Sequence, residues 1–227
     1  LTQDMRSATG YQLDMPAHTG KIYITSTNGS KLIKTEPTTG TVISFFGDLE
    51  FYNITFESTV SQNTNIYMYG NEITMGYGVD AIAIAPNYYP RIFGYSANPE
   101  DGLQGNPVIN VYSGKYGQVY GAGTAGAKLL TGDITINLYG GTIENVYDGG
   151  AGNVDGNTTI NIYNGVEITV KVAKAGTVTG TRTINLYNFT SAEEDALPIV
   201  TADFDAINKG LTATVPTPDS DFITFTV

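Results

Sequence analysis

The chain has 227 residues and a formal net charge of -11, from 22 acidic and 11 basic side chains. This length suits one sizeable domain or two small ones, and a hydrophobic content of 41% is too high for a disordered chain. The acidic balance argues against nucleic acid or an anionic membrane surface as a partner, because both are bound through clustered Lys and Arg. Thiolate chemistry and a two-histidine metal site are excluded, because the chain has no Cys and only one His, His18.

The N-terminal 40 residues show no clear repeat, and they begin at Leu1 without Met or a basic-then-apolar leader. We therefore expect a processed product or a piece of a longer protein. No stretch of ~18 or more apolar residues is present, so we expect no membrane insertion.

Between residues 41 and 80, short runs alternate apolar and polar side chains, which is typical of half-buried strands. Leu49-Glu50-Phe51 is one such run, and the run that ends at Ile73 lies 24 residues further on. Residues 80–104 differ, because they contain three Pro and several Tyr and are too long for one tight corner. We predict that they form an insertion or lateral loop.

From residue 105 the sequence repeats. A block of Ile-Asn-aliphatic-Tyr occurs four times, with offsets of 27, 24 and 24 residues between its Asn positions 110, 137, 161 and 185. A glycine column and an aliphatic column keep these offsets, and a valine column follows the 27 and 24 spacing. The columns are Gly105, Gly132, Gly156 and Gly180; Leu103, Leu130, Val154 and Val178; and Val119, Val146 and Val170. Four columns with shared spacing are hard to obtain by chance, so the repeat is real.

Each repeat unit contains three short alternating runs separated by Gly, Asn and Asp, for example residues 135–139, 142–147 and 153–155. Helical spacing is absent. Three strands per ~24-residue unit predict an all-β parallel β-helix, or β-solenoid, of roughly six to eight rungs. A β-propeller blade needs ~40 or more residues, and a leucine-rich repeat needs a Leu-rich scaffold with a helical return limb.

We expect the β-helix to span residues 41–190, with its insertion near 80–104, as one domain. Residues 1–40 are predicted to form an N-terminal cap and a first irregular rung, with His18 on the surface. Residues 191–227 are predicted to form a C-terminal cap segment, because uncovered strand edges promote aggregation.

Two elements are expected within the C-terminal segment. Ser191 and Glu194 have the spacing of a capping box, which predicts one helical turn over residues 192–197 before Pro198. Residues 222–227 alternate in the manner of a last strand.

The chain resembles right-handed parallel β-helix proteins of pectin-lyase-like architecture, and more narrowly the Gly- and Asn-rich repeat regions of secreted or surface proteins of gut bacteria. The blocks at residues 136–141 and 146–152, with their copies, carry this resemblance over residues 103–190 and loosely over 40–80. It implies a single-stranded, right-handed β-helix with capped ends and a bacterial, secreted or cell-surface location. It implies little about function, since this architecture hosts lyases, hydrolases, adhesins and stalks.

One outward face contains the candidate ligand-binding residues. With Ile136 and Leu138 inward, Thr135, Asn137 and Tyr139 point outward, and rungs stacked ~4.8 Å apart align their counterparts in columns. Rings and amides on a flat face suit a polysaccharide or a host surface glycan, but such ladders also stabilise solenoids without any ligand. Both interpretations stay open. The candidates are Tyr112, Tyr139, Tyr163, Tyr187, Asn110, Asn137, Asn161 and Asn185.

No catalytic residue is assigned. A polysaccharide lyase needs an Arg or Lys base within a charged cluster, and the three Arg residues are far apart in the sequence. A glycosidase needs paired carboxylates, and the acids of the repeat lie mostly in different columns, with Glu144 and Glu167 coming closest. No metal or other cofactor is expected. A calcium ion near Asp148 to Asn157 is a minor alternative, because this segment lacks the spacing of known calcium loops.

We therefore expect a non-catalytic extracellular surface module, adhesin-like or structural, that belongs to a larger surface protein and contacts glycans through the Tyr and Asn columns. A carbohydrate-active β-helix, of the lyase or glycosidase type, is the alternative. A third hypothesis is a structural spacer that binds no ligand.

Overall fold

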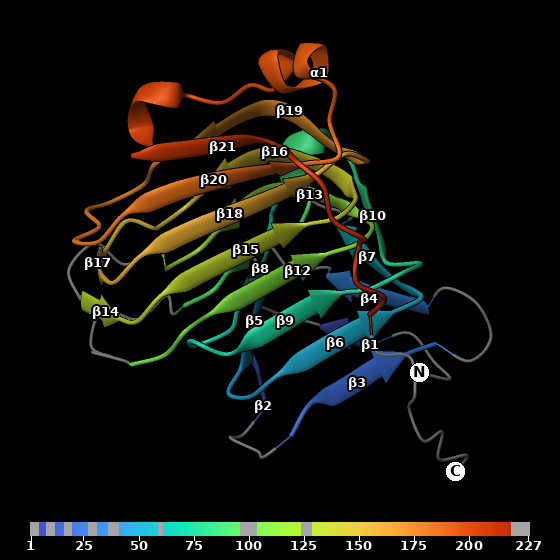
Figure 1. Ribbon diagram of the computed structural model, residues 1–227. Helices are drawn as coiled ribbons and strands as arrows, with labels where there is room; N and C mark the ends of the chain where they lie inside the picture. The colour runs from blue at the N-terminus through green and yellow to red at the C-terminus, as the bar shows by residue number, and fades with distance from the viewer. Residues whose placement is uncertain are drawn as a thin grey trace.

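The chain forms a parallel β-solenoid, seen in the computed structural model of Figure 1. The structure describes residues 5–7, 12–15, 20–26, 31–35, 41–58, 61–95, 104–123 and 129–218. All the paired strands in these ranges run parallel. The predicted all-β solenoid is confirmed.

The strands stack into four sheets, which we call A to D. Sheet A contains β1 (Met5–Ser7), β4 (Lys31–Thr35), β7 (Ile54–Ser58) and β10 (Asp80–Ala83). Sheet B contains β2 (Gln12–Met15), β5 (Thr41–Phe45), β8 (Thr64–Tyr67), β11 (Arg91–Phe93), β13 (Lys115–Tyr120), β16 (Gly141–Tyr147) and β19 (Val166–Ala173). Sheet C contains β3 (Ile22–Thr25), β6 (Leu49–Tyr52), β9 (Glu72–Met75), β12 (Val108–Val111), β15 (Ile134–Leu138), β18 (Thr158–Tyr163), β20 (Arg182–Tyr187) and β21 (Ala206–Leu211). Sheet D contains β14 (Leu129–Thr131) and β17 (Asn153–Asp155).

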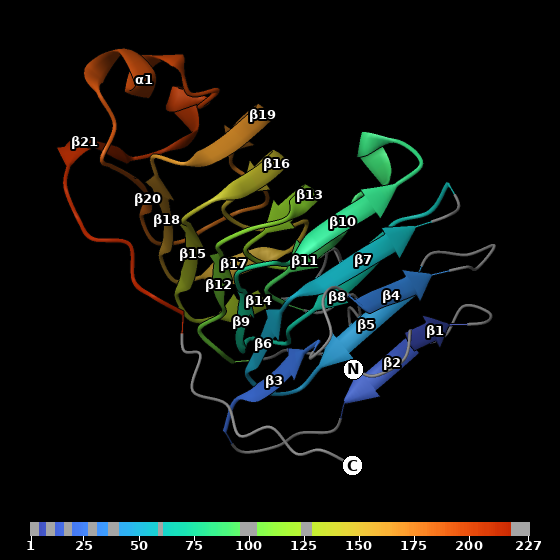
Figure 2. The same ribbon diagram turned by 90° about the vertical axis from the view of Figure 1, so that its right-hand side faces the viewer.

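Sheets B and C run along most of the solenoid, but the sheet that forms its third side differs between the two halves of the chain. Up to β12, each rung visits sheets A, B and C in turn, and sheet A lies on the path from C to B. After β12 the chain turns directly from sheet C into sheet B through short corners, and sheet D occupies the path from B to C. Figure 2 shows sheet A ending at β10 while the other sheets continue. The predicted insertion at 80–104 therefore contains two regular strands, β10 and β11, and one 3-10 turn, η1 (Pro86–Tyr88).

The core fills the space between the sheets with identical or similar side chains stacked one rung apart. Ile136 pairs in register with Ile109 on one side and Ile160 on the other, and all three are fully buried. Leu138 is buried in the same way, as predicted from the alternation. Burying an aliphatic side chain of this size contributes ~1.5–3 kcal/mol, so the repeated core is the main source of stability.

The glycine column marks a corner where successive rungs touch through their backbones. A Cβ on Gly156 would lie 2.2 Å from the carbonyl oxygen of Gly132, and one on Gly132 would lie 2.0 Å from that of Gly105. Gly132 also has a φ of 143°, which side-chain-bearing residues rarely adopt. The sequence keeps Gly at this position because no other residue leaves room for the next rung.

The N-terminal strands belong to the solenoid. Strands β1, β2 and β3 pair in register with β4, β5 and β6, and β1 to β4 lie within the segment 1–40 that was predicted to hold a cap and a first irregular rung. His18 and the alternating segment 222–227 lie outside the described residues.

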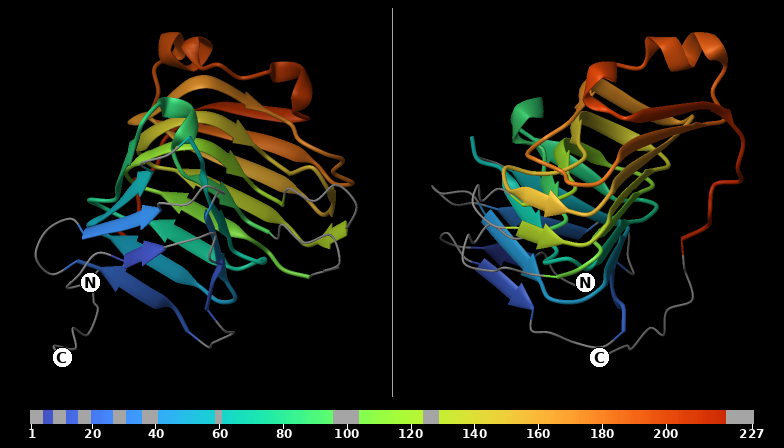
Figure 3. Two further views of the ribbon diagram at one scale, coloured as in Figure 1. Left: turned by 180° about the vertical axis from the view of Figure 1, so that it is seen from behind. Right: turned by 60° about the vertical axis from the view of Figure 1, so that its left-hand side comes forward.

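Residues 191–205 lie over the C-terminal end of the solenoid, as Figure 3 shows. Helix α1 (Ser191–Ala196) starts from a capping box formed by Thr190 and Glu193, one residue earlier than predicted. The chain then pairs with β19 near Val172, passes through η2 (Thr201–Asp203) and adds β21 as the last strand of sheet C. No helix within the described ranges is long and apolar enough to cross a membrane.

A bulge between β16 and β19 makes one predicted column wrong. Ile143 pairs with Ile168, but after the bulge Val146 pairs with Val172. Val172 is fully buried, whereas Val170 is 54% exposed. The column therefore continues through Val172, because the bulge lengthens this rung.

Replacing these two valines separately should show whether Val170 or Val172 continues the buried column of Val146. Val172→Ala should lower the free energy of unfolding by about 2 kcal/mol, because it removes two buried methyl groups and leaves a cavity. Val170→Ala should change it by less than about 0.5 kcal/mol, as expected for an exposed position. Denaturant unfolding of both variants measures the difference, and equal losses would contradict the bulge.

Candidate functional site

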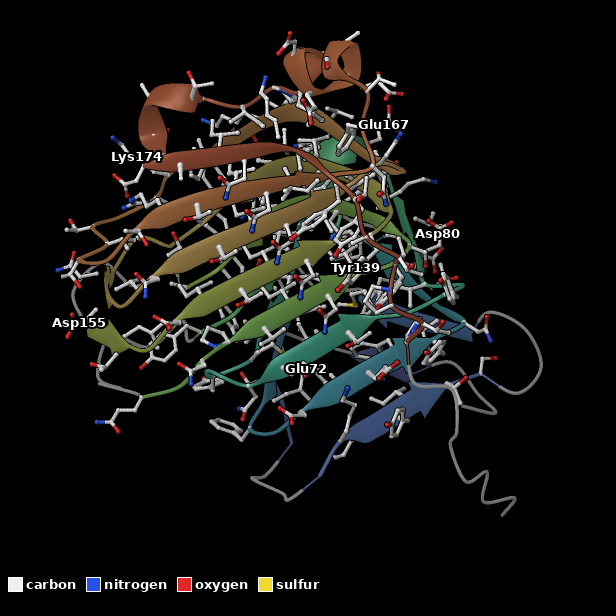
Figure 4. All side chains as sticks on the ribbon, viewed as in Figure 1. Glu72, Asp80, Tyr139, Asp155, Glu167 and Lys174 are labelled. Atoms are coloured by element: carbon white, nitrogen blue, oxygen red, sulfur yellow. The ribbon has the colours of Figure 1, made fainter. Side chains whose placement is uncertain are left out.

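The predicted binding face is the outer surface of sheet C. Strands β12, β15, β18 and β20 pair with one another in sequence. Their register places Asn110, Asn137, Asn161 and Asn185 directly opposite one another, and it aligns the outward Thr and Tyr residues of each strand in the same way. Figure 4 shows Glu72 at the foot of this face and Tyr139 at the ends of its strands. The structure thus brings together all eight candidate residues in two adjacent columns.

The asparagines form one continuous hydrogen-bonded ladder. Each side-chain amide nitrogen donates to the amide oxygen of the asparagine one rung nearer the N-terminus, and Asn208 on β21 adds a fifth member that the sequence pattern did not reveal. The Nδ2 to Oδ1 distances are 2.8 Å from Asn137 to Asn110, 2.7 Å from Asn161 to Asn137, 2.8 Å from Asn185 to Asn161 and 2.7 Å from Asn208 to Asn185. The amides are half-buried up to Asn185, so the first three bonds are only partly open to water, whereas the bond from Asn208 is exposed.

The ladder ends in a charged cluster at its N-terminal end. Asn110 donates to the hydroxyl of Thr74 at 3.2 Å and to the carboxylate of Glu72 at 3.3 Å. Lys21 lies 2.7 Å from Glu72 and 3.4 Å from the buried Glu50. Burial lowers the pKa of Lys21, but the two carboxylates outweigh burial and leave this pKa raised. The column thus terminates on paired charges.

The tyrosine rings follow one another along the strand ends, stacked in the Tyr112–Tyr139 and Tyr163–Tyr187 pairs and tilted by 46° between Tyr139 and Tyr163. Ring centroids are 4.4 Å apart between Tyr112 and Tyr139, 4.7 Å between Tyr139 and Tyr163, and 4.6 Å between Tyr163 and Tyr187. Tyr77 closes the lower end with an edge contact to Tyr112 at 5.5 Å. Because neighbouring rings cover one another's faces, the ladder presents ring edges and hydroxyl groups outward, and Tyr163 is only 8% exposed.

This geometry limits what the tyrosine column can bind. A sugar stacks on an open aromatic face, and the faces of Tyr139 and Tyr163 are already occupied by neighbouring rings. Residues 212–218 also run along this end of the sheet, as Figure 1 shows. Hydrogen-bonding capacity toward solvent therefore remains with the tyrosine hydroxyl groups, the amide ladder and the adjacent half-buried Thr135, Thr159 and Thr183.

A second aromatic column on sheet B was missed. Tyr67, Phe93, Tyr120 and Tyr147 stack with centroids 4.8, 5.0 and 4.6 Å apart, and the ammonium group of Lys171 lies 5.4 Å from the Tyr147 ring centroid. A signal was present in the sequence, because Val119-Tyr120 and Val146-Tyr147 share the 27-residue offset of the Asn block. Only Val119 and Val146 from these pairs entered the prediction from sequence, which did not include the tyrosines that follow them.

The acids that the sequence singled out lie apart from the sheet C face. Asp148 is buried and accepts hydrogen bonds from Thr158 at 2.8 Å, from the Ala175 amide at 2.9 Å and from the guanidinium of Arg182. Glu167 lies opposite Thr142, whose hydroxyl donates to it at 3.1 Å. Within the described ranges, no group of three or more His, Cys, Asp and Glu is placed to hold a metal ion.

A shallow polar cavity of about 380 Å³ lies beside the C-terminal cap. Two cations line it, and both already have partners: Lys174 lies 3.3 Å from Asp203, and Arg182 pairs with Asp148. The Lys174–Asp203 pair therefore joins the last rungs to the C-terminal cap, and the Arg182–Asp148 pair joins residues within the solenoid.

Comparisons with protein-family models, with curated proteins and with solved structures give no match. Function is therefore inferred from the fold and from the side chains themselves.

The amide ladder should contribute more to stability in its middle than at its end. Asn161→Ala removes two ladder bonds and should cost about 1–2 kcal/mol, whereas Asn208→Ala removes one and should cost about half as much. Thr159→Ala, on the same face of β18, is the control for loss of an outward polar side chain. Denaturant unfolding of the three variants tests this order, and equal costs would contradict a continuous ladder.

The tyrosine column should make the fold sensitive to alkali. Burial, followed by the neighbouring phenol of Tyr163, raises the pKa of Tyr139 to about 12, and burial raises the pKa of Tyr163 as well. When folding raises the pKa of a group, the protonated group contributes to the stability of the folded state. This contribution is complete below the ordinary tyrosine pKa of about 10, and it is lost as the pH rises through the pKa of the folded state. Denaturant unfolding at increasing pH should show this loss above about pH 10.

Tyr139→Phe is the matched variant for this test. It keeps the ring and removes one ionisable hydroxyl, so its unfolding free energy should fall less steeply over the same pH range. An identical fall would mean that the loss comes from other groups, such as the fully buried Tyr116, whose pKa burial also raises.

Proposed function

We propose that this chain is a non-catalytic extracellular module, adhesin-like or structural, in which the solenoid provides a rigid body and the outer face of sheet C provides the contact surface. The proposal is supported by how the polar side chains of this face are used. They bond mainly to their counterparts one rung away, which stabilises a flat and regular surface.

The observation that carries the proposal is the amide ladder. An Asn amide has two N–H donors and an oxygen with two lone pairs, and each interior amide uses one donor and one lone pair within the ladder. The second donor and the second lone pair stay available on a half-buried face, next to the hydroxyl groups of Thr135, Thr159 and Thr183. Sugars hydrogen-bond to such groups, so a glycan lying across several rungs is the ligand that we propose.

The contact differs in one respect from the expectation based on sequence. Because neighbouring rings lie on both sides of Tyr139 and Tyr163, we propose that Tyr112, Tyr139, Tyr163 and Tyr187 act through their hydroxyl groups and ring edges rather than by stacking on sugars. Affinity then comes from the addition of several weak hydrogen bonds along the sheet.

The likeness of the repeat blocks to pectin-lyase-like β-helices of bacterial surface proteins supports a secreted or cell-surface location and membership of a larger surface protein. A carbohydrate-active role is the alternative. Its weak point is the separation of the acids, since Glu167 lies opposite Thr142 rather than Glu144.

A panel of plant and mucosal polysaccharides, screened for binding and for product release, tests the proposal. Thr135→Val together with Thr159→Val removes two outward hydroxyl groups and leaves both ladders intact. Two hydrogen bonds of ~0.5–1.5 kcal/mol each correspond to a rise in Kd of about fivefold or more. Thr142→Val on sheet B is the control and should leave the Kd unchanged.

The outcomes distinguish the three functional hypotheses. Binding that depends on Thr135 and Thr159 supports the proposed contact face. Product release from any polysaccharide would replace the proposal with the enzymatic alternative. A correctly folded protein that binds nothing on the panel would leave the bare spacer.

A further inference from the structure

One row of polar side chains crosses the outer surface of sheet B. The strand register aligns these side chains one per rung, and each of them is half-buried and stands next in sequence to a fully buried core residue. Figure 2 shows three strands of this row, β13, β16 and β19, one after another along the solenoid. The row consists of Asn65 on β8, Arg91 on β11, Gln118 on β13, Asn145 on β16 and Lys171 on β19.

The two cations of this row differ from the other cations that the structure describes. Every other Lys or Arg with a described side chain forms a salt bridge with Asp or Glu, whereas Arg91 and Lys171 form none. The chain has 22 acidic and 11 basic side chains, so two cations without an acidic partner in one row are unexpected. The paired cations are Lys21, Lys115, Lys174, Arg182 and Lys209.

The guanidinium of Arg91 is partly buried without a hydrogen-bond acceptor. Its Nε is closed to solvent, and no described residue accepts a hydrogen bond from this nitrogen. Asn65, its neighbour in the register, has a buried Oδ1 that accepts no hydrogen bond from a described residue either. Burial, followed by the phenol of Tyr147, raises the pKa of Tyr120, and the charge of Arg91 opposes this rise. Because burial weakens the hydration of the guanidinium, a carboxylate that pairs with its Nη groups displaces less water than at an exposed arginine.

Lys171 lies over an aromatic ring at the other end of the row. Its Nζ is 5.4 Å from the ring centroid of Tyr147, which belongs to the aromatic column beside the row. A cation over a ring face keeps its charge and its N–H donors. Between the two cations stand the amides of Gln118 and Asn145, and Asn145 directs one N–H to a backbone carbonyl of the preceding rung at 3.5 Å. The row therefore has positive charges with amide donors and acceptors between them.

We propose that this row binds an acidic peptide segment of a partner protein, extended along the solenoid, with carboxylates four residues apart that pair with Arg91 and Lys171. The strands of these two cations are separated by three spacings of ~4.8 Å, or about 14 Å, and residues i and i+4 of an extended chain lie on the same side about 14 Å apart. The peptide groups between the two acids match Gln118 and Asn145, because side-chain amides and peptide groups both donate and accept hydrogen bonds.

The net negative charge of the chain does not prevent this contact. Exposed charges farther away than the Debye length, about 8 Å at physiological ionic strength, are largely screened. On the strands of sheet B, the described acids Glu144 and Glu167 form no salt bridge with either cation, and Glu167 instead accepts a hydrogen bond from Thr142. A bound peptide would therefore meet two cations that no described carboxylate contacts.

Binding of synthetic peptides to the full chain tests the proposal. The probe is a dye-labelled peptide of Ser and Thr that carries two Glu residues four positions apart. One control peptide has its two Glu residues three positions apart, and a second has Gln in place of both. Only the probe places two carboxylates on one side of an extended chain, so it should bind at least about threefold more tightly than the first control, and the Gln peptide should not bind. Equal binding of all three peptides would overturn the proposal.

Substitutions in the protein locate the contact. Arg91→Gln should raise the Kd of the probe about tenfold or more, and Lys171→Gln at least about threefold, because each removes a charge-assisted hydrogen bond. Arg91→Lys should weaken binding less than Arg91→Gln, since it keeps the charge and loses the planar fork. Lys209→Gln is the control, because it removes the same charge from sheet C and should leave the Kd unchanged. Equal effects of Arg91→Gln and Lys209→Gln would mean that the peptide responds to net charge alone.

Two competition results separate this site from other ligands and from the sheet C face. An oligosaccharide of glucuronic acid that displaces the probe at lower concentration than unlabelled peptide does would assign the row to an acidic glycan. Thr135→Val with Thr159→Val should leave probe binding unchanged, whether or not sheet C binds a glycan. Loss of probe binding in that variant would move the contact to sheet C and overturn the proposal.

Unfolding without any ligand shows whether Arg91 is instead a structural residue. Arg91→Met removes a partly buried charge that pairs with no described residue, so it should leave the denaturant midpoint unchanged or raise it. Arg182→Met is the matched variant, because it leaves the buried carboxylate of Asp148 without its cation and should lower the midpoint. A similar fall in both variants would mean that Arg91 stabilises the fold, which would contradict a binding role.

Discussion

Parallel stacking in register is the constraint on which the rest of this structure depends. Each residue of a rung lies one strand spacing, ~4.8 Å, from its counterpart in the next rung, so identical side chains meet along the whole solenoid. A shift of one residue would move the Ile136 and Leu138 columns from the core to the surface. The Asn and Tyr ladders on the outside keep the same register as the core columns inside.

The inner columns change where the solenoid nears its C-terminal cap. The position occupied by Ile134 becomes Thr158 and then Arg182 in the next two rungs, and these two side chains meet the buried Asp148. A buried ion pair adds little net stability, but it is costly to break because either partner alone would be an uncompensated charge. The last rungs are therefore tied together by polar contacts as well as by aliphatic packing.

The sequence predicted the features that repeat and missed those that occur once. Columns such as Ile109, Ile136, Ile160 and Ile184 identified the inward positions, because burial imposes the same residue type on every rung. The bulge before Val172 and the move of the third side from sheet A to sheet D have no counterpart in the spacing, since spacing counts residues per rung without showing where the corners lie. The Asn and Tyr columns were predicted for the same reason as the core. The covering of the Tyr faces was not, because alternation shows which side a ring is on and not how it is tilted.

The amide ladder has a direction, and this makes the two ends of the solenoid electrically different. Every donating N–H of the ladder points toward the N-terminal rungs and every accepting amide oxygen toward the C-terminal ones, so the amide dipoles add as peptide dipoles add in a helix. The positive end of this column meets the carboxylate of Glu72, much as an anion meets the first turn of a helix. A row of uncharged side chains on a sheet thus acquires a polarity that each added rung extends.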